Sequence, residues 1–112
     1  MKRPKQVNIL GVSYELIYVD KPSDVDIYKR ESLWGQIDYW TRTIRVYDHG
    51  RSEEDLWETI LHEILHGIAT ALHLKELKDE KNHDQLDLLS LALTDVLFRN
   101  KWFKKEQTDE PH

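Results

Sequence analysis

The sequence predicts a small α+β domain in which N-terminal antiparallel β-hairpins precede two packed α-helices. Before residue 50, short segments rich in β-branched and aromatic residues alternate with turn residues. After residue 50, apolar residues recur at helical spacing in two long stretches. A chain of 112 residues, 39% of them hydrophobic, is long enough for one domain with a modest core.

Two hairpins are expected in the first half of the chain. The first turns at Gly11 and the second near Thr41 and Arg42. The charged stretch between the hairpins contains Pro22 and is expected to be a connection. The four expected strands cover residues 6–10, 13–19, 33–40 and 43–47.

A first helix is predicted over residues 52–74. Ser52 is a typical N-cap residue, and three acidic residues follow it in the first turn. The apolar residues form a broad stripe, and His62 and His66 lie at its edge. Gly67 is unfavourable inside a helix, which suggests that another backbone or a substrate passes close to it.

A second helix is predicted over residues 82–101. Asn82 can cap it, and Gln85 follows three residues later, as in a capping box. From Leu86 to Phe98 the residues are apolar nearly all round, so this helix is expected to be largely buried.

Composition narrows the possible functions of this single domain. The absence of cysteine excludes disulfides, cysteine zinc fingers and a thiol nucleophile. The net charge of −5 argues against nucleic-acid binding. There is no signal peptide and no apolar stretch long enough for the membrane, so a cytoplasmic protein is expected. Residues 1–5 and 106–112 are expected to be flexible.

The segment His62-Glu63-Ile64-Leu65-His66 is an H-E-x-x-H motif. On a helix, residues i and i+4 share one face, so both imidazoles can bind one zinc ion. Glu63 can then act as the general base toward a water on the ion. A shuffled chain of this composition would contain the motif about 0.03 times, so the flanking cap and apolar stripe carry much of the weight.

Catalytic zinc usually has three protein ligands, so one further ligand is sought downstream. Asp87 interrupts an apolar run, where a buried carboxylate needs a cation, and His83 lies one turn earlier on the same face. Either residue could bind the ion while the other orients a ligand. His73 is too far along the first helix, and Asp84 and Asp95 fit structural roles at the second.

The motif in its context resembles a known family. A sheet of hairpins is followed by a helix that contains Leu61-His-Glu-Ile-Leu-His-Gly67 and then by an apolar helix that contains residues 87–94. This order of elements resembles that of the compact prophage metallopeptidases related to the ImmA/IrrE-type zinc peptidases. Residues 9–14 and 35–39 also look like that group, and the similarity covers most of residues 6–101. The resemblance implies a zincin-like fold, a Zn²⁺ cofactor, hydrolysis of a protein or peptide substrate, and an acidic third ligand within a pattern like E-x-x-A. Asp87-x-x-Ser90 matches that pattern loosely, with Asp for Glu and Ser for Ala.

Two other functions are consistent with the sequence. A non-catalytic protein could hold zinc in a closed site, with both His83 and Asp87 on the ion. A partner-recognition module could use exposed aromatic residues such as Trp34, Trp40 and Trp102. Tyr39, Tyr47 and His49 are aromatic or polar residues that could lie near the metal, although roles as strand and turn residues fit them better.

Overall fold

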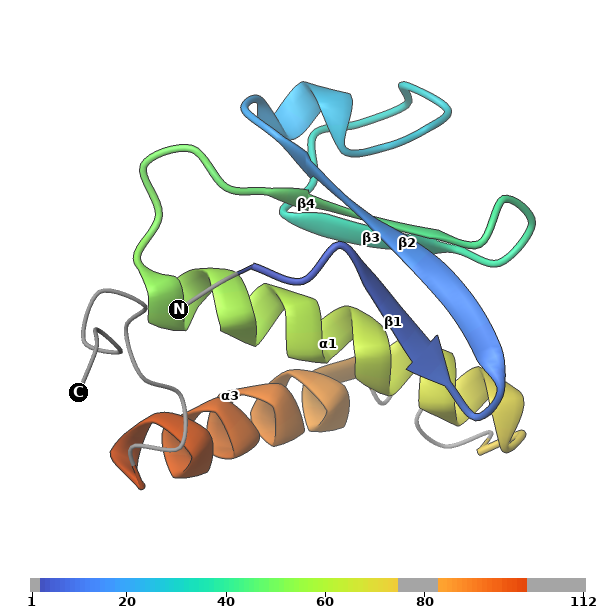
Figure 1. The fold of residues 1–112 in the computed structure, drawn as a ribbon. Helices are drawn as coiled ribbons and strands as arrows, with labels where there is room; N and C mark the ends of the chain where they lie inside the picture. Colours follow the sequence, from blue (N-terminus) through green and yellow to red (C-terminus); the bar gives the residue numbers. More distant parts are fainter. Residues whose placement is uncertain (1–2, 75–82, 101–112) are drawn as a thin grey trace, which may run out of the picture.

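A computed structural model describes residues 3–74 and 83–100, apart from the side chains of residues 83 and 84. It consists of a four-stranded mixed sheet at the N-terminus followed by two packed helices (Figure 1). The elements are β1 (Gln6–Ile9), β2 (Val12–Val19), the short 3-10 helix η1 (Pro22–Asp24), β3 (Gly35–Asp38), β4 (Thr43–Tyr47), α1 (Glu53–Ala71) and α3 (His83–Arg99). The four predicted strands and both helices are therefore confirmed. β4 has the expected bounds, β2 begins one residue earlier than expected, and the other elements are shorter.

The sheet has the strand order β1-β2-β4-β3, which makes β3 an edge strand. Both predicted hairpins are present as antiparallel pairs. The sheet is mixed, because β2 pairs with β4 in parallel, a pairing that the two predicted hairpins did not specify. The chain places β4 between β2 and β3, where its Ile44 and Val46 side chains are fully buried.

Helix α1 lies between the sheet and α3 (Figure 1). Ser52 is its N-cap, as predicted, and the Ser52 hydroxyl accepts a hydrogen bond of 3.1 Å from the Asp55 backbone N–H. Leu56 and Ile60 are fully buried beneath the sheet. These residues belong to one core cluster with Ile9, Tyr14, Leu16, Ile44 and Val46.

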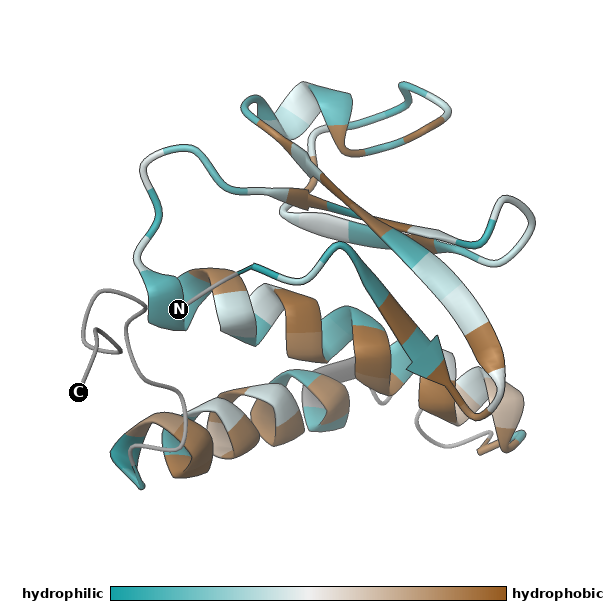
Figure 2. Ribbon diagram, viewed as in Figure 1, coloured by the Kyte–Doolittle hydropathy of each residue, from teal (hydrophilic) through white to brown (hydrophobic). Residues whose placement is uncertain are grey.

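Helix α3 packs on the far side of α1, and its burial differs from the prediction. Its buried residues are Leu86, Ser90 and Thr94, so two of the three carry hydroxyl groups. Both hydroxyls donate to backbone carbonyls one turn earlier in the helix, which satisfies them without water. Hydrophobic residues, brown on the α3 ribbon in Figure 2, also lie outside this buried face, and the exposed ones are Leu88, Leu89, Leu91, Leu93 and Val96. The expectation of a largely buried helix was therefore wrong.

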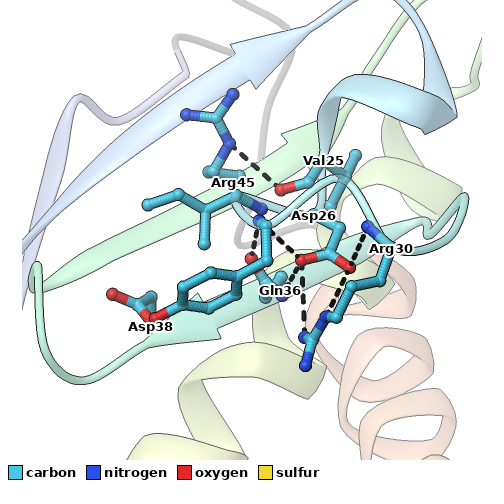
Figure 3. Close-up of polar contacts among 8 residues, drawn as sticks. Val25, Asp26, Arg30, Gln36, Asp38 and Arg45 are labelled. Atoms are coloured by element: carbon cyan, nitrogen blue, oxygen red, sulfur yellow. Dashed lines mark hydrogen bonds and ion pairs between the residues drawn. The ribbon is translucent and has the colours of Figure 1, made fainter.

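The connection between the hairpins is organised around Asp26, whose side chain is fully buried (Figure 3). Burial alone would raise the pKa of this carboxyl group. Hydrogen bonds outweigh this effect and hold the pKa far below its usual range; they come from the backbone N–H groups of Tyr28 and Arg30 and from the side chains of Arg30 and Gln36. Gln36 belongs to β3, so this network attaches the connection to the edge strand.

The described residues include no helix with the length and apolar character needed to cross a membrane.

Candidate functional site

His62 and His66 lie one turn apart on the face of α1 that borders a cleft. Their Nε2 atoms are 3.1 Å apart, and their rings meet edge to face with centroids 4.7 Å apart. Two imidazole nitrogens bound to one tetrahedral zinc ion are roughly 3.3 Å apart, because each Zn–N bond is about 2.0–2.1 Å long. The two histidine side chains therefore converge with a spacing that suits a shared metal ion.

Glu63 is buried between α1 and the edge strand, with only 6% of its surface exposed. Burial raises the pKa of its carboxyl to about 8, and the nearby charge of Asp87 acts in the same direction. The backbone N–H of Ile37 in β3 donates to the carboxylate and partly opposes this rise. The result is a carboxyl group whose affinity for a proton is matched to neutral pH, a property of general bases.

Two groups from α3 approach Nδ1, the ring nitrogen of His62 that does not face His66. An Asp87 carboxylate oxygen lies 3.1 Å from His62 Nδ1, and the Ser90 hydroxyl oxygen lies 3.3 Å from the same atom. A partner on Nδ1 fixes the orientation of an imidazole and leaves Nε2 available for a metal. Ser90 was not among the predicted site residues. Its signal in the sequence is a small hydroxyl residue one turn from Asp87 inside an apolar run.

The third metal ligand is not assembled among the described side chains. Within the described part of the chain, no group of three or more His, Cys, Asp or Glu side chains is placed to hold one ion. The side chain of His83 lies outside the described residues, so its predicted role as a ligand stays a prediction. Asp95 pairs with Arg99 on the exposed surface, as expected for a structural residue, and His73 is exposed beyond the end of α1.

Two glycines allow the sheet to lie close to α1. A Cβ atom at Gly35 would stand 2.6 Å from Thr59 Cγ2 and 3.1 Å from a Glu63 carboxylate oxygen. A Cβ atom at Gly67 would stand 2.8 Å from the end of the Ile9 side chain. The close approach expected at Gly67 is made by the side chains of Ile9 and Ile37, so the prediction of another backbone there was wrong.

A cleft of about 760 Å³ runs between β3 and α1 and includes the motif. Leu33 to Ile37 and Tyr39 line one side, α1 lines the other, and Asp87 of α3 contributes to its wall. The Tyr39 hydroxyl lies beside the cleft and accepts a hydrogen bond of 3.0 Å from Thr70, and burial raises its pKa. Tyr47 does not line the cleft and packs against Trp34 with the two rings tilted, while His49 is exposed in the turn before α1.

Sequence reasoning missed a second group of residues in this cleft. Arg51 and Thr59 line it next to Trp34, which the sequence singled out only as an exposed aromatic residue. No local pattern marks Arg51, because its contacts come from three separate segments of the chain.

Comparisons with known proteins add no relative: no family model, no curated protein and no solved structure matches this chain. The fold and site alone define a small α+β domain with a histidine pair and a buried glutamate beside an edge strand.

Proposed function

We propose that this protein is a zinc-dependent metallopeptidase with a zincin-like fold, in which Glu63 is the general base. The observation that carries the proposal is the convergence of His62 Nε2 and His66 Nε2 at 3.1 Å beside the buried Glu63 carboxyl, inside a cleft. A helix edge bearing two unrelated histidines would not require a buried acid between them, since burying a carboxyl group is costly.

The residues present fit a zinc ion. His62 and His66 would hold it through Nε2, and either Asp87 or His83 would complete the set of protein ligands. The contact between Asp87 and His62 Nδ1 suits an orienting role, whereas a role as a ligand would require the Asp87 side chain to leave Nδ1 and turn toward Nε2. Both assignments keep Asp87 at the site.

A zinc ion held there supplies Lewis-acid chemistry, lowering the pKa of a water ligand to about 7 and polarising a carbonyl oxygen. Glu63 accepts the proton of the attacking water and returns it to the leaving amine. Its burial suits this task, because a carboxyl group with a raised pKa is a stronger base than an exposed one. The Ile37 N–H keeps the carboxylate turned toward the cleft.

The edge strand β3 supports a peptide as substrate. The backbone N–H of Tyr47 in β4 donates to the backbone C=O of Trp34 at 2.9 Å, so Trp34 forms a hydrogen-bonded pair with β4. Along an antiparallel strand such pairs alternate with residues whose backbone groups face away from the partner strand. By this alternation Gly35 and Ile37 direct their backbone groups away from β4, along the cleft. The Ile37 N–H is engaged by the Glu63 carboxylate, which leaves the Gly35 backbone and the Ile37 carbonyl for a partner strand. An extended peptide can pair with these groups as an added strand, which would present one of its carbonyl groups to the motif.

The test compares Glu63→Gln with the wild-type protein on a library of fluorogenic peptides in the presence of zinc. Glu58→Gln is the matched control, because Glu58 also lines the cleft from α1 but has no part in the proposed chemistry. We expect Glu63→Gln to keep its zinc and lose at least 100-fold in kcat, whereas Glu58→Gln stays within a few-fold of the wild type. Full activity of Glu63→Gln would exclude it as the base.

A further inference from the structure

Arg51 stands at the end of the cleft that lies beyond Thr59. Its guanidinium group donates to the backbone carbonyls of Tyr47 and Asp55, both at 2.9 Å, and to the Thr59 hydroxyl at 2.8 Å. The guanidinium carbon also lies 4.7 Å from the centroid of the Trp34 ring. These contacts hold the guanidinium rigidly, because they come from β4, α1 and the residue preceding β3.

The charge of Arg51 is not neutralised by a contact. All three acceptors are uncharged, and among the described side chains no carboxylate lies within the 4.0 Å of an ion pair with it. Burial lowers the pKa of Arg51, and the more distant charges of Asp55 and Glu58 offset that effect only in part. Of the five N–H donors of a guanidinium group, only three are used in these bonds. A preorganised, partly desolvated cation with donors to spare favours a carboxylate ligand.

The position of Arg51 relative to Glu63 sets which part of a substrate could reach it. Thr59 contacts Arg51 directly and precedes Glu63 by one helical turn, which is about 6 Å along α1. Two residues of an extended peptide span about 6–7 Å. The guanidinium group is therefore about two substrate residues away from the bond that faces Glu63.

The direction in which a substrate pairs with β3 determines whether Arg51 faces the N-terminal or the C-terminal side of the cleaved bond. β3 and α1 run the same way along the cleft, because Gly35 lies against Thr59 and Glu63, whereas Ile37 lies against Gly67 farther along α1. A substrate that pairs antiparallel with β3, the commoner and slightly more stable arrangement, runs from the Ile37 end toward Trp34. Its C-terminal half then approaches Arg51.

We propose that Arg51 and Trp34 form a subsite that binds a carboxylate on the C-terminal side of the bond to be cleaved. The carboxylate is either the free C-terminus of a short peptide or the side chain of an aspartate or glutamate. This subsite rests on the proposed peptidase function, whose cleft it shares. It makes the protein selective for acidic or C-terminal segments of its substrates.

The experiment measures kcat/KM of the zinc-loaded wild type on matched peptides. One pair differs only in Glu or Gln two residues after the cleaved bond, and a second pair ends at that residue as a free acid or an amide. We expect the acidic member of at least one pair to be favoured about 10- to 100-fold, since hydrogen bonds to charged groups contribute about 1.5–3 kcal/mol. The pair that shows the preference identifies the source of the carboxylate.

Variants separate recognition from folding. Arg51→Met should abolish the preference, and Arg51→Lys should keep only part of it, because lysine lacks the planar fork. Arg45→Met is the matched control: Arg45 also donates to backbone carbonyls, of Asp24 and Val25, but does not line the cleft. It should leave the acid-to-neutral ratio unchanged, even where overall activity falls. Trp34→Leu should reduce the ratio if Arg51→Met does not fold.

The outcomes also separate this proposal from the peptidase itself. Hydrolysis of acidic and neutral peptides at equal rates overturns the subsite and leaves the peptidase intact. If no peptide is cleaved, the peptidase fails, and calorimetric binding of both peptide pairs to the protein decides the subsite. Equal affinity for the two members of each pair would then overturn it.

Discussion

Substitution of Gly35 by alanine tests the close contact between the edge strand and the motif helix. The new Cβ atom would stand 2.6 Å from Thr59 Cγ2, a distance that real Cβ atoms essentially never show. Thr59 cannot turn its methyl group away cheaply, because its hydroxyl accepts from Arg51 and donates to the Asp55 carbonyl. Strand and helix must therefore separate, and the Glu63 carboxylate, 3.1 Å from the same Cβ position, must shift with them.

The expected loss of stability is about 1–3 kcal/mol, the usual cost of an added methylene in a tightly packed site. For a domain of this size, such a loss lowers the melting temperature by roughly 3–15 °C. Activity should fall as well, because Glu63 and the cleft wall move together.

The double variant Gly35→Ala with Thr59→Ser supplies the control. Serine removes the clashing Cγ2 methyl and keeps the hydroxyl that binds Arg51. Thr59→Ser alone should cost about 1 kcal/mol for the lost methyl. Urea denaturation of the four proteins of the cycle should give a favourable coupling of about 1–2 kcal/mol between the two substitutions. Simple additivity would refute the contact as the cause of the destabilisation.

Three further predictions concern charge and metal. Asp26→Asn should lower the melting temperature at pH 7. Because the pKa of Asp26 in the folded protein lies below its ordinary 3.8, the wild type loses this stabilisation as the pH falls below about 4. The difference in melting temperature between variant and wild type should therefore shrink in that range. Glu63 shows the opposite sign: its pKa rises from 4.5 to about 8 on folding, so ionisation destabilises the metal-free fold increasingly as the pH climbs through that window. Metal-free Glu63→Gln should therefore be more stable than wild type at pH 8, on the order of a few kcal/mol by urea denaturation, and equal stability would contradict the burial. Asp87→Ala should weaken zinc affinity at least tenfold in a chelator competition, while Asp95→Ala on the same helix should not change it.

Short sequence patterns predicted the features of this fold that depend on neighbouring residues in the chain. The Ser52 cap and the spacing of apolar residues were sufficient to place α1, and the H-E-x-x-H segment placed the two histidines on one face. The parallel pairing of β2 with β4 could not be predicted, because the connection and β3 separate the two strands in the sequence and neither strand carries a signal for the pairing.

The prediction for α3 failed for a different reason. The run from Leu86 to Thr94 is apolar enough to suggest burial on all sides, yet its packed face carries Ser90 and Thr94. Small hydroxyl residues let α3 approach α1 closely and bring Asp87 to His62, and they satisfy their own hydrogen bonds inside the helix. Hydrophobicity alone does not distinguish which face of such a helix meets its neighbour.

Zinc K-edge X-ray absorption on protein purified without chelator tests most directly whether His62 and His66 hold a zinc ion with a position open to water. We expect one zinc per chain with two or three imidazole nitrogens at about 2.0–2.1 Å and at least one oxygen ligand from water, and loss of that zinc in His62→Ala. Absence of stoichiometric zinc would contradict the metal site. A sphere closed by four protein ligands would contradict the peptidase.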